Sequence, residues 1–240
     1  MNILITGGTS GIGEAAVKKL AGNNSNTIYF TYSKNLASAE NFLRSYSNTK
    51  AFKCDFQKES SVRNLIDAIG GWNLDVLINN AYVGSSQGLH FHKQEPVDFL
   101  DSFLMNIMPV IQVTQKTLET FRKKKAGKII NILTAALINV PPAGYSIYAA
   151  NKAYLQQLSK SWSKEYVRFG ITSNCISPNF METHLTQNTD ARIIEQMIAE
   201  HPLKKLLSPD EVADCVNFLV NAPTQVNGVN IVVNAGMSMI

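Results

Sequence analysis

Tyr148 and Lys152 are the residues of this 240-residue chain whose types and spacing could do chemistry most directly. Residues four apart share one face of a helix, so the phenol and the ammonium are expected to lie side by side. An ammonium beside a phenol favours phenolate and would bring the tyrosine pKa from its usual value near ~10 closer to neutral pH. Such a tyrosine can pass a proton to or from a carbonyl or an alcohol. The alternative is a solvated surface pair, because any amphipathic helix can carry Tyr and Lys at this spacing.

A glycine-rich segment near the start of the chain gives this pair its context. The apolar residues 3–5 predict a buried strand, which leads into Thr6-Gly7-Gly8-Thr9-Ser10-Gly11-Ile12-Gly13 and then into a helical pattern. Glycines at 7, 11 and 13 would let a pyrophosphate approach backbone N–H groups at a helix N-terminus. Their spacing, Gly-x3-Gly-x-Gly, differs from the common Gly-x-Gly-x2-Gly fingerprint. The strand, turn and helix context still predicts nucleotide binding over a plain turn.

Short apolar strands alternate with helical patterns along the rest of the chain. The later strands are predicted at residues 27–32, 51–54, 74–78, 128–133, 171–176 and 229–233. Because these strands are apolar throughout, both faces of the sheet should be covered. This pattern predicts an α/β fold of the Rossmann type, a doubly wound parallel sheet of about seven strands with helices on both faces. No linker or repeat divides the sequence, so one domain is expected over residues 1–240.

Composition excludes several classes of function. The net charge of +4 is small and dispersed, which argues against nucleic acid as a partner, and no apolar run approaches the ~18 residues of a membrane span. The three cysteines lack a Cys-x2-Cys pair and lie in apolar patterns, so reduced thiols and a cytoplasmic location are expected. The four histidines lack ligand spacing, and no metal site is predicted.

Polar residues follow most of the predicted strands. In open parallel sheets, ligands bind beyond the carboxyl ends of the strands. Each residue has a structural alternative as a turn or strand end, but together they predict one site. They are Ser33 and Lys34 after the second strand, Asp55 after the third, Asn79-Asn80-Ala81 after the fourth, Thr134 after the fifth, and Ser177-Pro178 after the sixth.

With these motifs in this order, the chain resembles the short-chain dehydrogenase/reductase family, in the compact branch that includes acyl-carrier-protein ketoreductases and carbonyl reductases. Thr6-Gly7 with Gly11 and Gly13 matches the nucleotide motif, Asn79-Asn80-Ala81 the motif after strand four, Asn106 the helix asparagine, and Tyr148 with Lys152 the catalytic pair. The resemblance implies hydride transfer between a nicotinamide and a ketone or ketoacyl carbon, with Tyr148 as general acid in reduction. It further implies that Lys152 holds the nicotinamide ribose while lowering the tyrosine pKa, and that Asn106 holds a relay water.

The resemblance also implies the remaining site residues. Thr134 takes the place of the serine that bonds the substrate carbonyl, and it keeps the hydroxyl. Asp55 resembles the residue that bonds the adenine amino group, with a turn cap as its alternative. The implied cofactor-binding set is Gly7, Thr9, Ser10, Gly11, Ile12, Gly13, Ser33, Lys34, Asp55, Phe56, Asn80, Ala81, Tyr148, Lys152, Pro178 and Thr183.

The end of the second strand indicates which cofactor is used. An acid there would bond the ribose hydroxyls of NAD and repel the 2′-phosphate of NADP, but no acid occurs. Ser33 can hydrogen-bond a phosphate and Lys34 can offset its charge. The sequence therefore predicts NADP(H) over NAD(H), although a loop lysine can also be simply solvated.

Three departures from the family pattern keep a second hypothesis open. Thr134 replaces the family's serine, Tyr82 stands where the family has glycine after Asn-Asn-Ala, and Asn179 replaces the glycine after Pro178. The Tyr82 ring could cover the cofactor edge, narrow the substrate entrance or simply fill space. The second hypothesis is a catalytically weak NAD(P)-binding regulatory or scaffold protein. We favour an enzyme, because binding alone would not require Tyr148 and Lys152 at this spacing.

The segment 179–207 resembles the family's substrate lid. Met181, Leu185 and Met197 would give it an apolar lining, although such residues also pack onto cores. The resemblance further implies a small carbonyl or alcohol substrate and a homo-oligomer, either a tetramer or a dimer. Leu155, Leu158 and Trp162 would suit a subunit contact or, equally, a core face.

Overall fold

A single parallel sheet forms the centre of the molecule. The computed structural model describes residues 1–86, 88–138, 140–186 and 189–238. Within these ranges seven strands pair in the order β3-β2-β1-β4-β5-β6-β7, and every pairing is parallel. This confirms the predicted doubly wound sheet. The strands are β1 (Asn2–Ile5), β2 (Thr27–Tyr32), β3 (Thr49–Lys53), β4 (Val76–Asn79), β5 (Gly127–Ile132), β6 (Ile171–Pro178) and β7 (Asn230–Val233).

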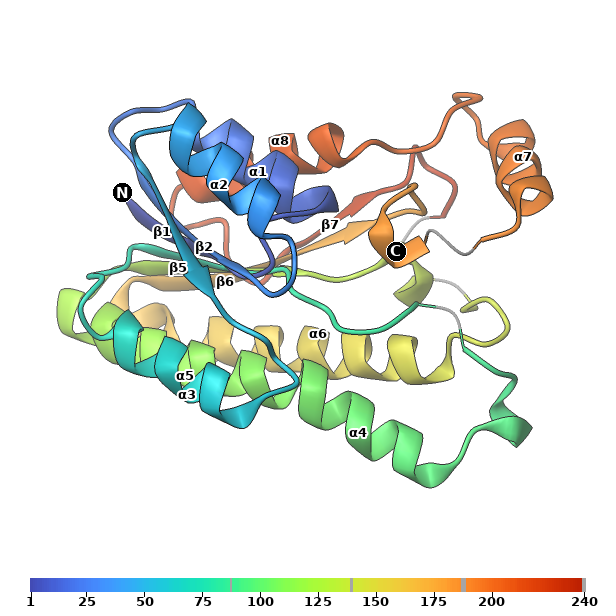
Figure 1. Cartoon of the computed structure of the whole chain (residues 1–240), viewed down its shortest axis with the longest axis horizontal. Helices are drawn as coiled ribbons and strands as arrows, with labels where there is room; N and C mark the ends of the chain where they lie inside the picture. The colour runs from blue at the N-terminus through green and yellow to red at the C-terminus, as the bar shows by residue number, and fades with distance from the viewer. Residues whose placement is uncertain (87, 139, 187–188, 239–240) are drawn as a thin grey trace.

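Helices cover both faces of the sheet (Figure 1). On one side lie α1 (Gly11–Ala21), α2 (Leu36–Ser45) and α8 (Pro209–Asn221), and on the other α3 (Glu59–Ile69), α4 (Pro96–Asn106), α5 (Met108–Lys124) and α6 (Ser146–Tyr166). Strand side chains alternate between the two layers. Ile3 and Ile5 join the core under α1 and α8, whereas Leu4 joins the core under α3 and α5. The central strands β1 and β4 are mostly apolar because both of their faces are buried.

Strand β6 is the most polar of the buried strands, and it continues beyond its predicted end. Ser177 and Pro178 pair with Val232 and Val233 of β7, so backbone pairing extends the strand past the apolar run. Buried hydroxyls and amides within β6 find partners on neighbouring elements. The Oγ atoms of Ser159 and Ser173 lie 2.8 Å apart.

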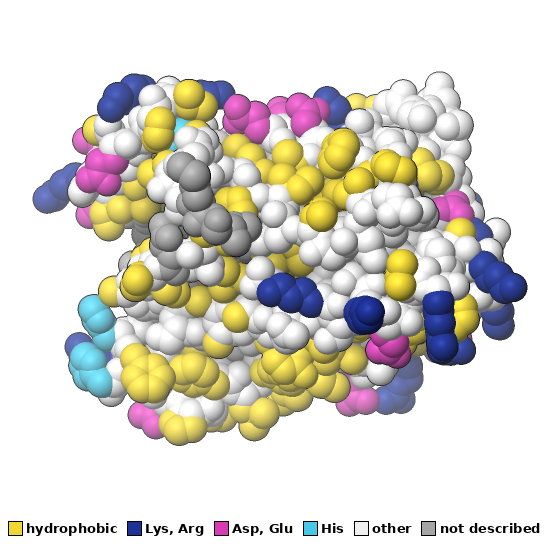
Figure 2. Space-filling view, turned by 180° about the vertical axis from the view of Figure 1, so that it is seen from behind, with side chains coloured by type: hydrophobic (Ala, Val, Ile, Leu, Met, Phe, Trp, Pro, Cys, Tyr) yellow, Lys and Arg dark blue, Asp and Glu magenta, His cyan; other side chains and the backbone are white. Residues whose placement is uncertain are grey.

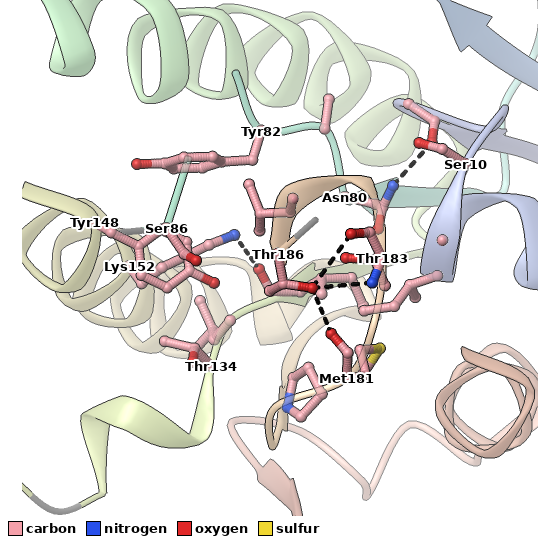
Figure 3. A pocket seen from close by; sticks show the side chains of 18 of the residues that line it. Ser10, Asn80, Tyr82, Ser86, Thr134, Tyr148, Lys152, Met181, Thr183 and Thr186 are labelled. Carbon is pink, nitrogen blue, oxygen red and sulfur yellow. Dashed lines mark hydrogen bonds between the residues drawn. The ribbon is translucent and has the colours of Figure 1, made fainter. Parts of the chain in front are cut away.

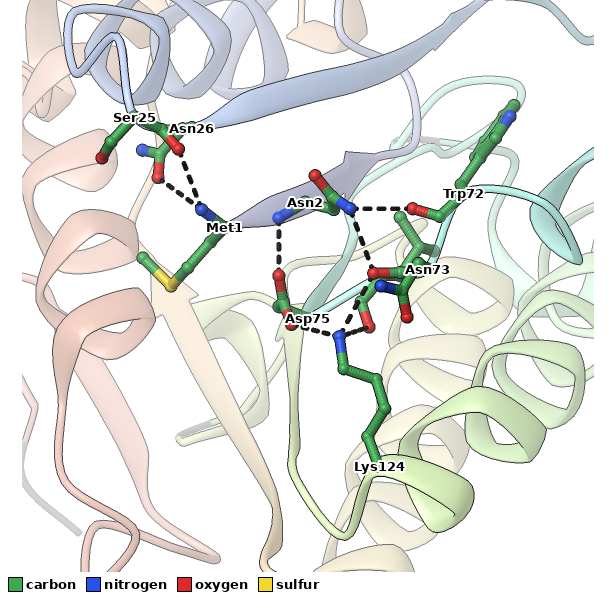
Figure 4. A network of polar contacts seen from close by, with 9 residues as sticks. Met1, Asn2, Ser25, Asn26, Trp72, Asn73, Asp75 and Lys124 are labelled. Carbon is green, nitrogen blue, oxygen red and sulfur yellow. Dashed lines mark hydrogen bonds and ion pairs between the residues drawn. The ribbon is translucent and has the colours of Figure 1, made fainter.

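Charged residues fix the ends of several elements. Lys124, in the last turn of α5, is paired with Asp75 and donates to the carbonyls of Asn73 and Leu74 (Figure 4). Asp75 also accepts from the backbone N–H of Asn2 at 2.7 Å, which joins β1 to the start of β4. A capping box begins α8, since Ser208 and Glu211 bond each other's backbone N–H groups.

The segment between β6 and α8 contains η4 (His184–Thr186) and α7 (Ala191–Glu200). Helix α7 projects from the body of the molecule beside the carboxyl edge of the sheet (Figure 1). Helix α7 carries Met197 and has no fully buried residue within its described length.

Three further predictions can be compared with the structure. The thiols are free, with Cys54 and Cys175 buried and Cys215 half-buried. Leu155 belongs to the core between α4, α5 and α6, so of its two predicted roles the structure selects the core face. Across the described ranges, no helix is long and apolar enough to cross a membrane, and no cluster of three metal-ligating side chains is formed.

Candidate active site

One cleft opens along the carboxyl edge of the sheet. Its volume is about 660 Å³, and it runs from the glycine turn past the ends of β2 to β6 to α6 and the segment after Pro178. Except for Gly13 and Asn106, every residue in the predicted catalytic and cofactor-binding sets lines this cleft. The ends of parallel strands therefore bring these residues together, as expected.

The glycine turn is shaped to hold an extended ligand close to the backbone. Gly7 and Gly11 have φ angles of +69° and +51°, in the left-handed region that favours glycine. A Cβ on Gly13 would lie 2.0 Å from the Gly7 carbonyl oxygen, so this position supports the turn from behind. Asn80 donates to the carbonyls of Thr6 and Gly7 at 2.9 and 3.0 Å and fixes the turn to the end of β4. Such a turn at the N-terminus of α1 fits a pyrophosphate.

The far end of the cleft carries the residues expected at an adenosine. Ser33 and Lys34 follow β2, and Asn35 donates to the Thr9 carbonyl at 3.2 Å, joining this loop to the glycine turn. Asp55 lines the cleft and also accepts from the backbone N–H of Gln57 at 3.1 Å. Asp55 is thus both a turn cap and a cleft residue.

Tyr148 and Lys152 lie on one buried face of α6, as predicted. Tyr148 is 8% exposed and Lys152 6% exposed. The Lys152 ammonium donates to the Ile132 carbonyl of β5 at 2.7 Å and lies 5.8 Å from the centre of the Tyr148 ring. Burial lowers the pKa of Lys152 to about 8. The pair is therefore no solvated surface contact.

The expectation that Lys152 lowers the pKa of Tyr148 is wrong for this structure. The pKa of Tyr148 is raised, mainly because the phenol is buried, and Tyr82 and Tyr145 act in the same direction. The hydrogen bond to Thr134 opposes this shift. The reason is geometric: the ammonium is bonded to the Ile132 carbonyl and faces the Tyr148 ring. At neutral pH the phenol keeps its proton.

Thr134 directs its hydroxyl toward the phenol. It is the N-cap of η2 (Ala135–Leu137), and its Oγ1 accepts from the backbone N–H of Ala136 at 3.2 Å. With that acceptor position occupied, the hydroxyl hydrogen is available for Tyr148. Thr134 and Tyr148 therefore lie on the same part of the cleft wall (Figure 3).

Asn106 does not line the cleft, and its side chain is taken up by bonds to neighbouring groups, while the relay water implied by the resemblance stays a prediction. Its Oδ1 accepts from the Val83 N–H at 2.6 Å, and its Nδ2 donates to the carbonyls of Val83 and Ser102, both at 3.1 Å. These bonds occupy the amide and hold the loop after β4 against α4. Asn106 therefore fixes the position of that loop.

Two further tyrosines surround Tyr148. Tyr82 and Tyr145 both pack edge-on against its ring, with ring centres 5.0 and 5.8 Å away. Tyr82 also places its ring 5.2 Å from the Lys152 ammonium. For Tyr82 the sequence signal was its place directly after Asn-Asn-Ala, which left its role open. Tyr145 gave no signal beyond its nearness to Tyr148.

A doubly wound sheet with a glycine turn and a buried Tyr-Lys pair in one cleft defines the class of nicotinamide-dependent oxidoreductases. The family model described as enoyl-(acyl carrier protein) reductase matches residues 7–238. The chain belongs to the short-chain dehydrogenase/reductase family, and it is an NAD(P)-dependent enzyme of that family.

Curated relatives and solved structures match almost the whole chain. It is 29% identical to carbonyl reductase family member 4 of Xenopus laevis, over 98% of this chain and 97% of the relative. It is 30% identical to the 3-oxoacyl-[acyl-carrier-protein] reductase FabG of Vibrio cholerae, over 99% and 97%. The structure of 3-ketoacyl-(acyl-carrier-protein) reductase from Brucella melitensis complexed with NADH superposes with a TM-score of 0.87 at 25% identity, covering 99% of this chain and 98% of that one. ElxO with NADP bound gives 0.85 at 26% identity, covering 98% and 97%.

Proposed function

We propose that this enzyme reduces a ketone or ketoacyl group to an alcohol with NADPH, and that Tyr148 is the general acid. The observation that carries the proposal is the convergence of the Tyr148 and Thr134 hydroxyls with Lys152 in the cleft that also holds the glycine turn. The names of the Vibrio cholerae and Xenopus laevis relatives, a 3-oxoacyl reductase and a carbonyl reductase, support the same reaction class.

The cleft residues fit such a cofactor along their whole length. The turn from Gly7 to Gly13 would hold the pyrophosphate, and Asp55 with Phe56 the adenine. Ser33 and Lys34 would hold a 2′-phosphate, which supports NADPH over NADH. When bound, NADPH supplies the hydride. The residues that would hold its nicotinamide half are Asn80, Ala81, Tyr148, Lys152, Pro178 and Thr183.

The chemistry assigned to the protein is proton transfer at the substrate oxygen. Thr134 and Tyr148 donate to the carbonyl oxygen, and Tyr148 gives up its proton as that oxygen gains negative charge. Because the pKa of Tyr148 is raised, the phenol is protonated and ready to donate at neutral pH. Lys152, which is bonded to the Ile132 carbonyl, would hold the nicotinamide ribose.

The experiment is a turnover assay with a matched tyrosine control. Purified protein with NADPH is offered ketones, quinones, sugars and acyl thioesters, and loss of nicotinamide absorbance is followed. Tyr148→Phe should abolish reduction while retaining NADPH affinity, whereas Tyr145→Phe should remain active because its hydroxyl has no assigned proton transfer. A Tyr148→Phe protein that reduces substrate at the parental rate would overturn the assignment. NADPH binding without turnover of any compound would favour the regulatory protein.

The segment 179–207 is proposed as a substrate lid. Met181, Leu185 and Met197 line the cleft, which gives this segment an apolar inner surface. Helix α7 stands clear of the body, so it can move without disturbing the sheet (Figure 1).

A homo-oligomer in the cytoplasm is the proposed assembly. Apolar side chains gather along the lower edge of the molecule in Figure 2. Val97, Leu100 and Leu104 of α4 are 55, 56 and 50% exposed, which a partner subunit would cover. The free thiols support a reducing compartment. Sedimentation of the parent and a Leu100→Lys variant tests whether this surface joins subunits.

A further inference from the structure

The Tyr82 ring forms one wall of the catalytic end of the cleft. Its centre lies 5.0 Å from that of Tyr148 with an interplanar angle of 82°, and 5.2 Å from the Lys152 ammonium. Figure 3 shows Tyr82 on the side of the catalytic pair opposite Met181. The wall therefore faces the lid segment across the site of reaction.

This wall is anchored at both ends. Burial raises the pKa of Tyr82, and Ser102 of α4 and Asn151 of α6, which lie beside its hydroxyl and are bonded to each other at 2.8 Å, oppose that rise. The next residue, Val83, is held by Asn106 through both its N–H and its carbonyl. Moving the ring out of the cleft would break several of these bonds, so the wall is rigid compared with a solvated side chain.

The opposite side of the cleft is adaptable. Met181 lies there, Leu185 and Met197 of the same segment also line the cleft, and unbranched methionine side chains adjust to the shape of a ligand. A carbonyl oxygen bonded to Thr134 and Tyr148 must place one substituent of its carbon toward the tyrosine wall and the other toward this apolar side. The two substituents therefore meet very different amounts of free space.

We propose that Tyr82 is a specificity-determining residue that admits only a small group, such as a methyl, on its side of the reacting carbonyl. The longer apolar substituent lies along Met181, Leu185 and Met197. The substrate class is then an unsymmetrical carbonyl compound with one short and one extended apolar arm. This inference rests on the proposed function, since it takes Thr134 and Tyr148 as the groups that hold the oxygen.

A pair of isomeric ketones tests the wall. 2-Octanone carries a methyl as its short arm and 4-octanone a propyl, while their total apolar content is the same. Discrimination by a hydrophobic pocket is about 10-fold to 200-fold per methylene, so the parent enzyme should favour 2-octanone in kcat/KM by at least about tenfold. Tyr82→Gly should reduce this preference about tenfold or more. Tyr82→Phe should keep it, because the ring remains.

Direct binding separates this inference from the proposed reaction. Affinities of 2-octanol and 4-octanol for the protein saturated with NADPH, which cannot oxidise an alcohol, are measured by calorimetry in the parent, Tyr82→Gly, Tyr82→Phe and a milder Tyr82→Val variant. A preference for 2-octanol that disappears only in the Gly and Val variants supports the wall, even if no ketone is turned over. If the parent shows no preference, or if Tyr82→Gly and Tyr82→Val keep the parental ratio within twofold, the wall is overturned while ketone reduction can still stand.

Discussion

Replacing Lys152 by methionine should remove a free-energy penalty on folding, which arises because the lysine ammonium is buried in the cleft. The ammonium is 6% exposed and is bonded to the Ile132 carbonyl, and burial lowers its pKa from 10.5 to about 8. Such a displacement corresponds to about 3 kcal/mol of lost folding stability at neutral pH. Near pH 9.5 this loss of folding stability falls to roughly 1.4 kcal/mol, because most folded molecules have already lost the Lys152 proton.

The sign of this effect follows from proton binding. Between about pH 8 and 10.5 the unfolded chain holds the lysine proton and the folded chain does not, so the parent gains stability as the pH rises through this window. Lys152→Met has no such proton. The advantage of the variant over the parent should therefore shrink by about 2 kcal/mol between about pH 7 and pH 9.5, whatever the methionine gains or loses in packing.

Urea unfolding of the cofactor-free proteins at both pH values measures this difference, followed by circular dichroism and by fluorescence of Trp72 and Trp162. Lys160→Met is the control, because Lys160 is an exposed residue of the same helix. Its stability relative to the parent should not change with pH. If the Lys152→Met difference agrees within about 0.5 kcal/mol at the two pH values, the ammonium is not desolvated as described and the reasoning fails.

Three further predictions follow from the turn, the strand network and the adenosine end. Gly13→Ala should abolish NADPH binding and destabilise the fold by about 3 kcal/mol or more, because the new Cβ would lie 2.0 Å from the Gly7 carbonyl oxygen. Gly22→Ala is the control, because its Cβ would lie 3.4 Å from the nearest atom. This control should fold normally and bind NADPH normally in calorimetry. Asp75→Asn should lower the free energy of unfolding by less than about 1 kcal/mol at neutral pH. Because the Asp75 pKa is lowered, this contribution is present above about pH 4 and lost as the pH falls, so parent and variant melting temperatures should converge in acid. Lys34→Glu should weaken NADPH binding by about tenfold or more without weakening NADH binding, whereas Lys164→Glu should change neither affinity.

Much of the fold could be predicted because the strands are buried on both faces. The side chains of residues 3–5 alternate between the two cores, one on each face of the sheet, so every one of these positions is buried and apolar. A sheet with one face exposed to solvent would instead show alternating apolar and polar residues. The ends of strands were less predictable. The predicted end of β6 fell short of Ser177 and Pro178, because pairing with β7, and not hydropathy, extends that strand.

The location of the candidate site could also be predicted, since polar residues after parallel strands must meet at one edge. The protonation of its groups could not. The spacing of Tyr148 and Lys152 predicts that they are neighbours, but a pKa depends on burial and on which atom the ammonium meets. Here the Ile132 carbonyl takes the hydrogen bond, and this contact joins α6 to β5, which no spacing within the helix predicts.

Tyr82 illustrates the same difference between neighbours in sequence and neighbours in space. The sequence left its ring three possible roles, because a loop has no periodicity that fixes the direction of a side chain. Ser102 and Asn151, on two helices that follow much later in the chain, fix that direction. Of these two helices, α4 presents the exposed apolar surface described above, and α6 presents Tyr148 and Lys152 to the cleft. Because the ring and not its hydroxyl forms the proposed wall, Ser102→Ala should keep the octanone preference of the parent, as Tyr82→Phe should. A Ser102→Ala variant that loses this preference while its NADPH affinity is unchanged would show that the polar contacts of the hydroxyl hold the ring in place.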